Sequence, residues 1–421
     1  MKKRLFLLPE TLFLILVLTI PIQLGKHFWP SFAHVLGLRV DFLSPTIFAT
    51  DIVIFLLVLS FLARVFLTGK FPSKGLVVSI GIFLLTEVFA TIFSKNFLLS
   101  SWSLVKFFEF STLAIAVSGL NYDKLNLNFP KIFTFSAAFS VVLATLQFWQ
   151  QKSLSLWILG ERSFNLVTPG IAKVELLGTQ ILRPYATFPH PNVLAGFLVI
   201  SAISIFFSNF GKFTKLSILS ILIFGLFLTF SRSAWLSLAA AGAIAAATRF
   251  NWQKVVTAII IFLLGLVFLQ LIFPQNPVTT RFLQLGESDI HSLVLRKKLA
   301  DAGLAMFFEN LPAGVGLGNF IPSLPKFWDY EETVRFLQPV HNIPLLVLAE
   351  TGLIGAAGVT FLIAGTFLNF LKNFKQIPAF ILPSWVVIIL ISNFDHYFWT
   401  LQQGQILFWT ILGLTWAKTA K

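Results

Sequence analysis

The chain has 421 residues, of which 57% are hydrophobic and only 11% are charged, against about 25% charged residues in an ordinary soluble domain. So few charges cannot cover a water-facing surface of this size, which excludes a soluble globular enzyme and a disordered chain. The absence of cysteine excludes disulfides, thiolate metal sites and cysteine nucleophiles. An excess of 31 Lys and Arg over 17 Asp and Glu fits nucleic-acid binding or basic cytoplasmic loops, and the hydrophobicity favours a membrane protein.

A helix needs about 20 apolar residues to cross a bilayer, and the chain contains twelve such stretches. The sequence therefore predicts an all-α fold, a polytopic membrane helical bundle of about twelve transmembrane helices that forms a single integral membrane domain over residues 1–421. The predicted spans lie near residues 5–24, 46–67, 75–93, 102–120, 131–150, 190–209, 215–231, 232–248, 254–273, 343–370, 378–395 and 404–418. The seventh and eighth stretches are nearly continuous, so their division is the least defined.

The short loops predict the orientation of the bundle. With the N-terminus in the cytoplasm, the short inside loops hold sixteen of the 31 Lys and Arg residues and one acidic residue, Asp123. Positive charge in short loops marks the cytoplasmic side. An even number of spans then places both termini in the cytoplasm.

Two long outside loops, residues 151–189 and 274–342, interrupt the bundle, and loops of this length are usually functional. In the larger loop, Ser288 or Asp289 is a candidate cap for a helix that runs to about Asn310. Four apolar residues fall on one face of this helix: Leu295, Leu299, Ala302 and Met306. The pattern predicts an amphipathic helix, before the tenth span, that lies on the membrane surface or covers the mouth of the bundle.

Three arginines stand at predicted outer positions, where charge near lipid is costly and usually functional. Arg183 precedes the sixth span and is either a phosphate ligand, because a guanidinium matches phosphate oxygens, or an interfacial anchor. Arg232 lies at the outer turn between the seventh and eighth spans, or is a buried charge that needs a partner. Arg296 belongs to a basic triplet that is either a ligand-binding group or a solvated face attracted to anionic lipid.

Other polar side chains gather near the same predicted ends. His341 and Asn342 open the tenth span, and a histidine is the usual general base near neutral pH; a lone interfacial histidine is more often structural. His190 and Asn192 carry the same ambiguity. Glu350 lies nine residues into the tenth span and is a candidate partner for a buried arginine.

Several patterns with known chemistry are missing. The segment Gly314–Gly318 lacks the Gly-Lys-Ser/Thr ending of a phosphate-binding loop. The sequence contains no Asp-x-Asp and no His-Glu-x-x-His element. Nothing in it therefore indicates a metal site or nucleic-acid binding.

Four segments together resemble the O-antigen ligase and O-antigen polymerase-related membrane proteins, over residues of about 180–360 that include the outer loop 274–342. They are Arg183-Pro-Tyr-Ala-Thr-Phe-Pro-His-Pro-Asn192, Thr229-Phe-Ser-Arg-Ser-Ala-Trp-Leu236, Arg296 followed by Pro312-Ala-Gly-Val-Gly-Leu-Gly-Asn-Phe320, and His341-Asn342 through Glu350-Thr-Gly-Leu-Ile-Gly355. Each element alone is weak. Their order, their separation by predicted spans and the large loop before the tenth span make the match specific.

The resemblance implies a glycosyltransferase that moves a glycan from an undecaprenyl diphosphate carrier to an acceptor sugar hydroxyl on the outer face of the bacterial inner membrane, in lipopolysaccharide or polysaccharide biosynthesis. It implies no cofactor and no metal. The partners would be the carrier-linked donor, a lipid or glycan acceptor and membrane lipids, with no nucleic acid. By the resemblance, His341 is the catalytic base and Arg183, Arg232 and Arg296 bind the diphosphate.

Two other functions stay open from the sequence. A polymerase of the related branch would extend the glycan on the same lipid carrier. A lipid-carrier flippase or transporter would show paired charges within spans and a repeat between the two halves of the chain, and no such repeat is visible in the sequence.

Overall fold

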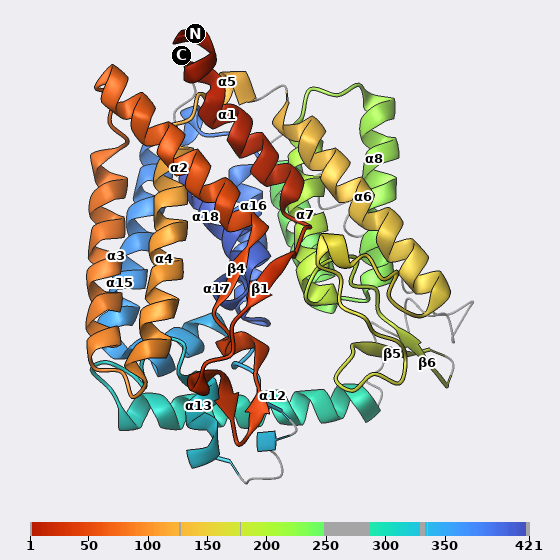
Figure 1. Cartoon of the computed structure of the whole chain (residues 1–421). Coiled ribbons are helices and arrows are strands. Elements are labelled where there is room, and N and C mark those ends of the chain that lie inside the picture. The colour runs from red at the N-terminus through yellow and green to blue at the C-terminus, as the bar shows by residue number, and fades with distance from the viewer. Residues whose placement is uncertain are drawn as a thin grey trace.

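The computed structural model describes residues 2–125, 128–176, 178–247, 287–328, 333–334 and 336–417, and in these the chain is mostly helical. Most of the helices run side by side as a bundle (Figure 1). Helix α12 (Glu287–Glu309) instead lies across the end of the bundle that is opposite to the start of α1 (Lys2–Thr19) (Figure 1). This is the helix that the sequence predicted within the larger loop. Its expected apolar face is buried at Leu299, Ala302 and Met306.

Within the described residues, six helices are long and apolar enough to cross a membrane. They are α2 (Ala49–Thr68), α3 (Lys74–Ile92), α4 (Phe97–Ser118), α6 (Phe129–Gln150), α8 (Lys212–Thr229) and α15 (Ile343–Asn373). The structure thus agrees with an all-α membrane protein, but it does not confirm the predicted number of about twelve spans. The predicted ninth span, residues 254–273, lies outside the described residues.

Other predicted spans coincide with helices that are shorter than a bilayer requires. They are α7 (Pro191–Phe207), α9 (Arg232–Ala247), α16 (Ile381–Ser392) and α18 (Gln402–Trp416). The division between the seventh and eighth stretches is real, because Phe230 adopts a left-handed conformation, with φ 52°, and ends α8. Helix α7 is the centre of the bundle, since every residue from Pro191 to Ile205 is buried.

Helix α15 is broken at Gly352, whose φ of 62° and ψ of −162° are not helical. The break leaves the carbonyls of the preceding turn without helical donors, and the glycine-rich segment supplies them. The backbone N–H of Val315 donates to the Ala349 carbonyl, and that of Gly316 to the Glu350 carbonyl, both at 2.9 Å. The segment that sequence patterns excluded as a phosphate-binding loop is therefore a brace for this kink.

Short antiparallel ribbons, which the all-α prediction omitted, stand at the α12 end of the bundle (Figure 1). The first pairs β1 (Gly25–His27) with β4 (Thr46–Phe48), so that His27 lies opposite Thr46. The others pair β2 (His34–Val35) with β3 (Leu38–Arg39), and β5 (Lys173–Leu176) with β6 (Thr179–Leu182). With two to four residues per strand, they are too short to show a period-two pattern in the sequence. A further short helix, α5 (Tyr122–Leu125), precedes α6.

Gly352 and Gly69 offer a matched test of the kink. Both have a positive φ, but a Cβ on Gly352 would lie 2.6 Å from backbone atoms of Leu311, Pro312 and Gly314, whereas a Cβ on Gly69 meets nothing within 4 Å. Gly69→Ala should therefore cost about 1 kcal/mol of backbone strain, and Gly352→Ala clearly more, because backbone must shift. Thermal unfolding of both variants in detergent measures the difference. Equal melting temperatures would contradict the proposed brace.

Candidate active site

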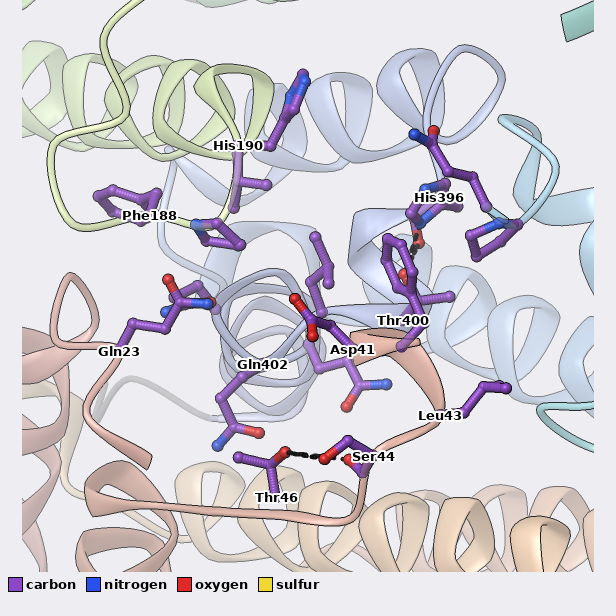
Figure 2. A pocket seen from close by; sticks show the side chains of 18 of the residues that line it. Gln23, Asp41, Leu43, Ser44, Thr46, Phe188, His190, His396, Thr400 and Gln402 are labelled. Carbon is purple, nitrogen blue, oxygen red and sulfur yellow. Dashed lines mark hydrogen bonds between the residues drawn. The ribbon is translucent and has the colours of Figure 1, made fainter. Parts of the chain in front are cut away.

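The structure contains a cavity of about 440 Å³ that brings together distant parts of the chain (Figure 2). Its walls come from the β1–β4 segment, from α4, from the loop before α7, from the glycine-rich segment with residues 338–341, and from residues 395–405 between α16 and α18. Three of the residues predicted from sequence line it: His190, His341 and Glu350. Figure 2 shows His190 and His396 on the wall opposite Thr46 and Ser44.

The turn between α16 and α17 (Tyr397–Thr400) supplies an acid and a histidine to the cavity wall. The Asp395 carboxylate accepts hydrogen bonds from the Asn192 side-chain amide at 2.7 Å and from the His396 backbone N–H at 2.8 Å. The His396 imidazole is bonded through Nδ1 to the Thr400 hydroxyl at 2.6 Å. The His341 ring packs edge-on against the His396 ring, with centroids 5.1 Å apart. Among the described residues, no three His, Cys, Asp or Glu side chains form a group that could hold a metal ion.

Prolines place both predicted histidines at helix starts. Pro191 opens α7, and the His190 imidazole caps the helix by accepting the Asn192 backbone N–H at 3.1 Å. Proline is favoured in the first turn, where its missing N–H has no helical partner. Asn342 caps α15 in the same way by accepting the Leu345 N–H at 2.9 Å. Asn342 is thus a helix cap, and its amide also donates to the Asn393 carbonyl at 3.4 Å.

The His341 imidazole is a neutral ring with an unpartnered nitrogen among the described residues. Its Nδ1 atom is buried and has no hydrogen-bond partner within the part of the chain that the structure describes. Burial, together with the neighbouring His396 and Arg296, lowers the pKa of His341 from 6.5 to about 3. The ring is therefore neutral at pH 7 and faces the cavity with a free lone pair or N–H, according to its tautomer.

The charge around His341 is balanced by one carboxylate. Burial alone would raise the pKa of Asp395, but His396, His341 and His190 and the Asn192 amide favour its charged form and lower the pKa. For His190, burial and the nearby Arg183 lower the pKa to about 3. The arrangement is thus a carboxylate surrounded by neutral imidazoles and backed by arginines.

Arg183 lies directly behind this cluster. It is buried, its Nε donates to the Thr229 carbonyl at 2.8 Å and its Nη2 donates to the Asn192 side-chain oxygen at 2.7 Å. Asn192 therefore joins Arg183 to Asp395. The position is not that of an interfacial anchor, which would keep its guanidinium in water.

The other two predicted arginines lie farther from the cavity wall. Arg296, on α12, donates through Nη1 to the Phe394 carbonyl at 3.4 Å, next to Asp395, and its charge acts on His341. Arg232 is the first residue of α9, three residues after Thr229, and it does not line the cavity. The structure thus brings Arg183, Arg296 and His341 to one cluster and leaves Arg232 at its margin.

Glu350 was predicted as the partner of a buried arginine. In the structure it is buried, and its Oε1 accepts the Phe320 backbone N–H at 3.3 Å. It also lines the cavity. The contact with Phe320 ties Glu350 to the end of the glycine-rich segment and holds that segment against the cavity.

Two residues of the cluster had no assigned role in the sequence analysis. They are Asp395 and His396. The quartet Asn393-Phe-Asp-His396, which separates two apolar stretches, is the feature that could have marked them. A third, Arg162, lines the cavity and forms an exposed ion pair with Asp41 at 3.4 Å.

Comparison with known proteins finds a similarity to one family over part of the chain. Residues 217–360 match a family model described as O-Antigen ligase. The match covers less than half of the chain, and over those residues the chain is similar to O-antigen ligases. No curated protein matches the chain significantly. The matched residues include Arg232, Arg296, His341, Asn342 and Glu350, whereas Arg183, His190, Asn192 and the Asp395–His396 turn lie outside them.

Acid should destabilise the protein through the cluster. The folded chain keeps His190 and His341 neutral far below their ordinary pKa of 6.5, whereas the unfolded chain takes up protons there. Each histidine therefore lowers the free energy of unfolding, by up to about 1 kcal/mol per pH unit, as the pH falls below 6.5. Thermal unfolding between pH 7.5 and 5 measures this slope. His341→Gln, which cannot be protonated, should have a shallower slope, and an unchanged slope would refute the neutral His341.

Proposed function

We propose that the protein is a glycosyltransferase of the O-antigen ligase type. It takes a glycan from an undecaprenyl diphosphate carrier and transfers it to a sugar hydroxyl of an acceptor, on the outer face of the bacterial cytoplasmic membrane. The observation that carries the proposal is the His341 imidazole, which is neutral and unpartnered at Nδ1 within the described residues and lines a polar cavity. The family match over residues 217–360 supports the reaction class.

The transfer is a single displacement. The acceptor oxygen forms a bond with the anomeric carbon of the donor sugar while the bond from that carbon to the diphosphate oxygen breaks, so the configuration at the carbon inverts. The acceptor hydroxyl gives its proton to His341, and general base catalysis of this kind needs a group that is unprotonated at the working pH. The diphosphate leaves on its lipid carrier with increased negative charge.

Arginines stabilise the leaving diphosphate. Arg296 is partly exposed and acts on His341 electrostatically, so it is placed to contact the leaving group. We assign Arg232, at the margin of the cluster, a supporting positive charge. Arg183 is committed to Thr229 and Asn192, so we assign it chiefly to positioning, because it fixes the amide that holds Asp395. Donors that are fixed before the reaction stabilise developing charge without reorganisation.

Helix α12 supports a site at a membrane surface. It lies across one end of the bundle (Figure 1) and leaves Leu304 and Phe308 exposed. Lys297, also exposed, belongs to the same helix. Apolar and basic side chains on one such helix favour a position in the headgroup region, where anionic lipid attracts the charge. A lipid carrier in the bilayer would reach the cavity from there.

One observation favours the transporter alternative. Paired charges do occur among the helices: Arg64 with Glu10 at 2.6 Å, and Lys106 with Asp51 at 2.9 Å. We favour glycan transfer, because Arg64 also donates to the Gly119 carbonyl at 2.7 Å as a structural tie between helices, and Lys106 faces the same cavity as His341.

The proposal is tested by purified protein in lipid nanodiscs with an undecaprenyl diphosphate glycan and acceptors that include lipid A core, polysaccharide and carrier-linked glycan. His341→Ala should lower the transfer rate by about 10² to 10⁴, the usual contribution of a general base. His34→Ala is the control, since His34 does not line the cavity. Transfer to no acceptor, or full activity of His341→Ala, would refute the function; transfer to the carrier-linked glycan alone would identify a polymerase.

Arg296→Ala should reduce kcat/KM for the carrier-linked donor by at least about tenfold, because it removes a charge from the leaving diphosphate. Lys297→Ala, which changes an exposed neighbour on the same helix, should leave kcat/KM nearly unchanged. A similar loss in both variants would indicate that α12 attracts lipid through its overall charge and that Arg296 has no specific contact.

A further inference from the structure

A second group of polar and aromatic side chains lines the cavity between α4 and the start of α18. The polar members are Ser103, Lys106, Gln402 and Gln403, and the aromatic members are Trp102, Phe107 and Trp399. None of them takes part in the transfer step described above. Amides, hydroxyls and aromatic rings on one wall are the groups that bind a ring with several hydroxyls.

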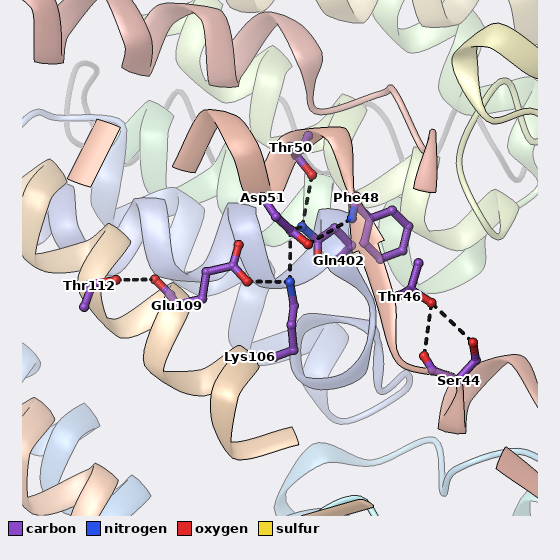
Figure 3. Close-up of polar contacts among 9 residues, drawn as sticks. All are labelled: Ser44, Thr46, Phe48, Thr50, Asp51, Lys106, Glu109, Thr112 and Gln402. Carbon is purple, nitrogen blue, oxygen red and sulfur yellow. Dashed lines mark hydrogen bonds and ion pairs between the residues drawn. The ribbon is translucent and has the colours of Figure 1, made fainter. Parts of the chain in front are cut away.

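Lys106 and Gln402 are held in fixed orientations (Figure 3). The Lys106 ammonium donates to Glu109 at 2.5 Å and pairs with Asp51 at 2.9 Å. The Gln402 amide donates to the Thr50 hydroxyl at 3.0 Å and to Asp51. Asp51 in turn accepts the Phe48 backbone N–H at 2.9 Å at the start of α2. These groups need no rearrangement to meet a ligand, and a site of this kind loses little entropy on binding.

Gln403 is the exception in this well-satisfied network. Its side chain is 1% exposed, and neither its amide nitrogen nor its amide oxygen has a hydrogen-bond partner within the described residues. A buried polar group left without partners costs about 1–3 kcal/mol, so an amide with both ends free in a cavity wall indicates a ligand that completes it. Its oxygen can accept from a hydroxyl or N–H, and its nitrogen can donate twice.

The aromatic side chains suit the apolar faces of a sugar. Phe107 and Trp399 pack together with ring centroids 4.5 Å apart, and Trp102 is partly exposed on the same helix as Phe107. The face of an aromatic ring is negative, so it attracts the weakly positive C–H bonds of a sugar ring. Apolar walls with a few placed polar groups are the usual form of a small-ligand site.

The charge of this wall selects against acidic sugars. Lys106 is the ammonium of the group, and it already pairs with two carboxylates, Asp51 and Glu109. Among the described residues of this wall, no other positive charge is present to bind a uronic acid. We propose, resting on the proposed function, that this wall is a subsite for one uncharged sugar ring with hydroxyl or acetamido groups, and that Gln403 is its central hydrogen-bonding residue.

Saturation-transfer NMR on the full chain in nanodiscs tests the subsite without turnover. The probes are methyl N-acetyl-β-glucosaminide, methyl β-glucuronide, and N-acetylglucosamine linked to farnesyl diphosphate. At least one of the two N-acetylglucosamine probes, whose sugar ring is uncharged, should bind, and the glucuronide should bind at least about tenfold more weakly. Binding of the methyl glycoside alone assigns the subsite to the acceptor, and binding of the diphosphate-linked sugar alone assigns it to the donor.

Gln403→Leu should weaken the binding of the neutral probe by about tenfold, since two hydrogen bonds are lost. It should keep or raise the melting temperature, because it replaces an unpaired amide by an apolar group of similar size; a lower melting temperature would mark a structural role instead.

Gln150→Leu, at an exposed glutamine outside the cavity, should bind the probe as the native chain does. His341→Ala should keep sugar binding while losing transfer, so the two proposals fail separately. Absent binding of both N-acetylglucosamine probes, equal binding of the glucuronide, or unchanged binding by Gln403→Leu would overturn the subsite.

Discussion

A buried arginine and a buried aspartate, joined through one asparagine, organise the cavity end of this protein. Asn192 accepts from Arg183 and donates to Asp395, so a single amide links a loop, the start of the central helix α7 and the turn after α16. Arg183 extends the link to the end of α8 through the Thr229 carbonyl. Away from water, neither charge is tolerable without its partners. Folding therefore has to bring these four segments together, and this also brings the neighbouring histidines close to one another.

Interrupted helices make room for this polar cluster. In the apolar part of a membrane, backbone groups must be paired within the protein, so non-helical segments occur only where they line a cavity or are covered by other elements. Helices α7, α16 and α18 begin or end at or near residues that line the cavity, among them His190, Asp395 and Gln402. The short helices and the cavity thus belong together. Where a helix stops short, the non-helical residues that follow or precede it contribute side chains to the cavity.

Hydropathy and helical periodicity predicted much of the bundle, because both depend on local sequence. They predicted the position of α12 and the break between α8 and α9. They did not predict the ribbon of β1 and β4, whose strands are about twenty residues apart and too short to carry a pattern. The predicted eleventh span, residues 378–395, ran past the end of α16 at Ser392, so Asp395 was counted with a span.

The predicted site residues were chosen for their chemistry and their nearness to span ends, and this was enough for His341, His190 and Glu350, all of which line the cavity. It could not distinguish Arg183, which turns inward to Asn192, from Arg232, which stands at the margin. That difference depends on contacts between residues 46 positions apart in the chain. The Lys106–Asp51–Gln402 network is more remote still, since Asp51 and Gln402 are separated by 351 positions.

The kink at Gly352 connects the helix that follows His341, the proposed base, with α12. The first part of α15 is tied to the glycine-rich segment by Val315 and Gly316, and the part after the kink is tied to Leu311 through the Leu353 N–H at 2.8 Å. That segment follows α12 directly along the chain. His341 lies two residues before α15. These hydrogen bonds therefore connect the helix that follows His341 with the segment that follows α12. A displacement of α12 would therefore reach His341, the proposed base, through these backbone hydrogen bonds.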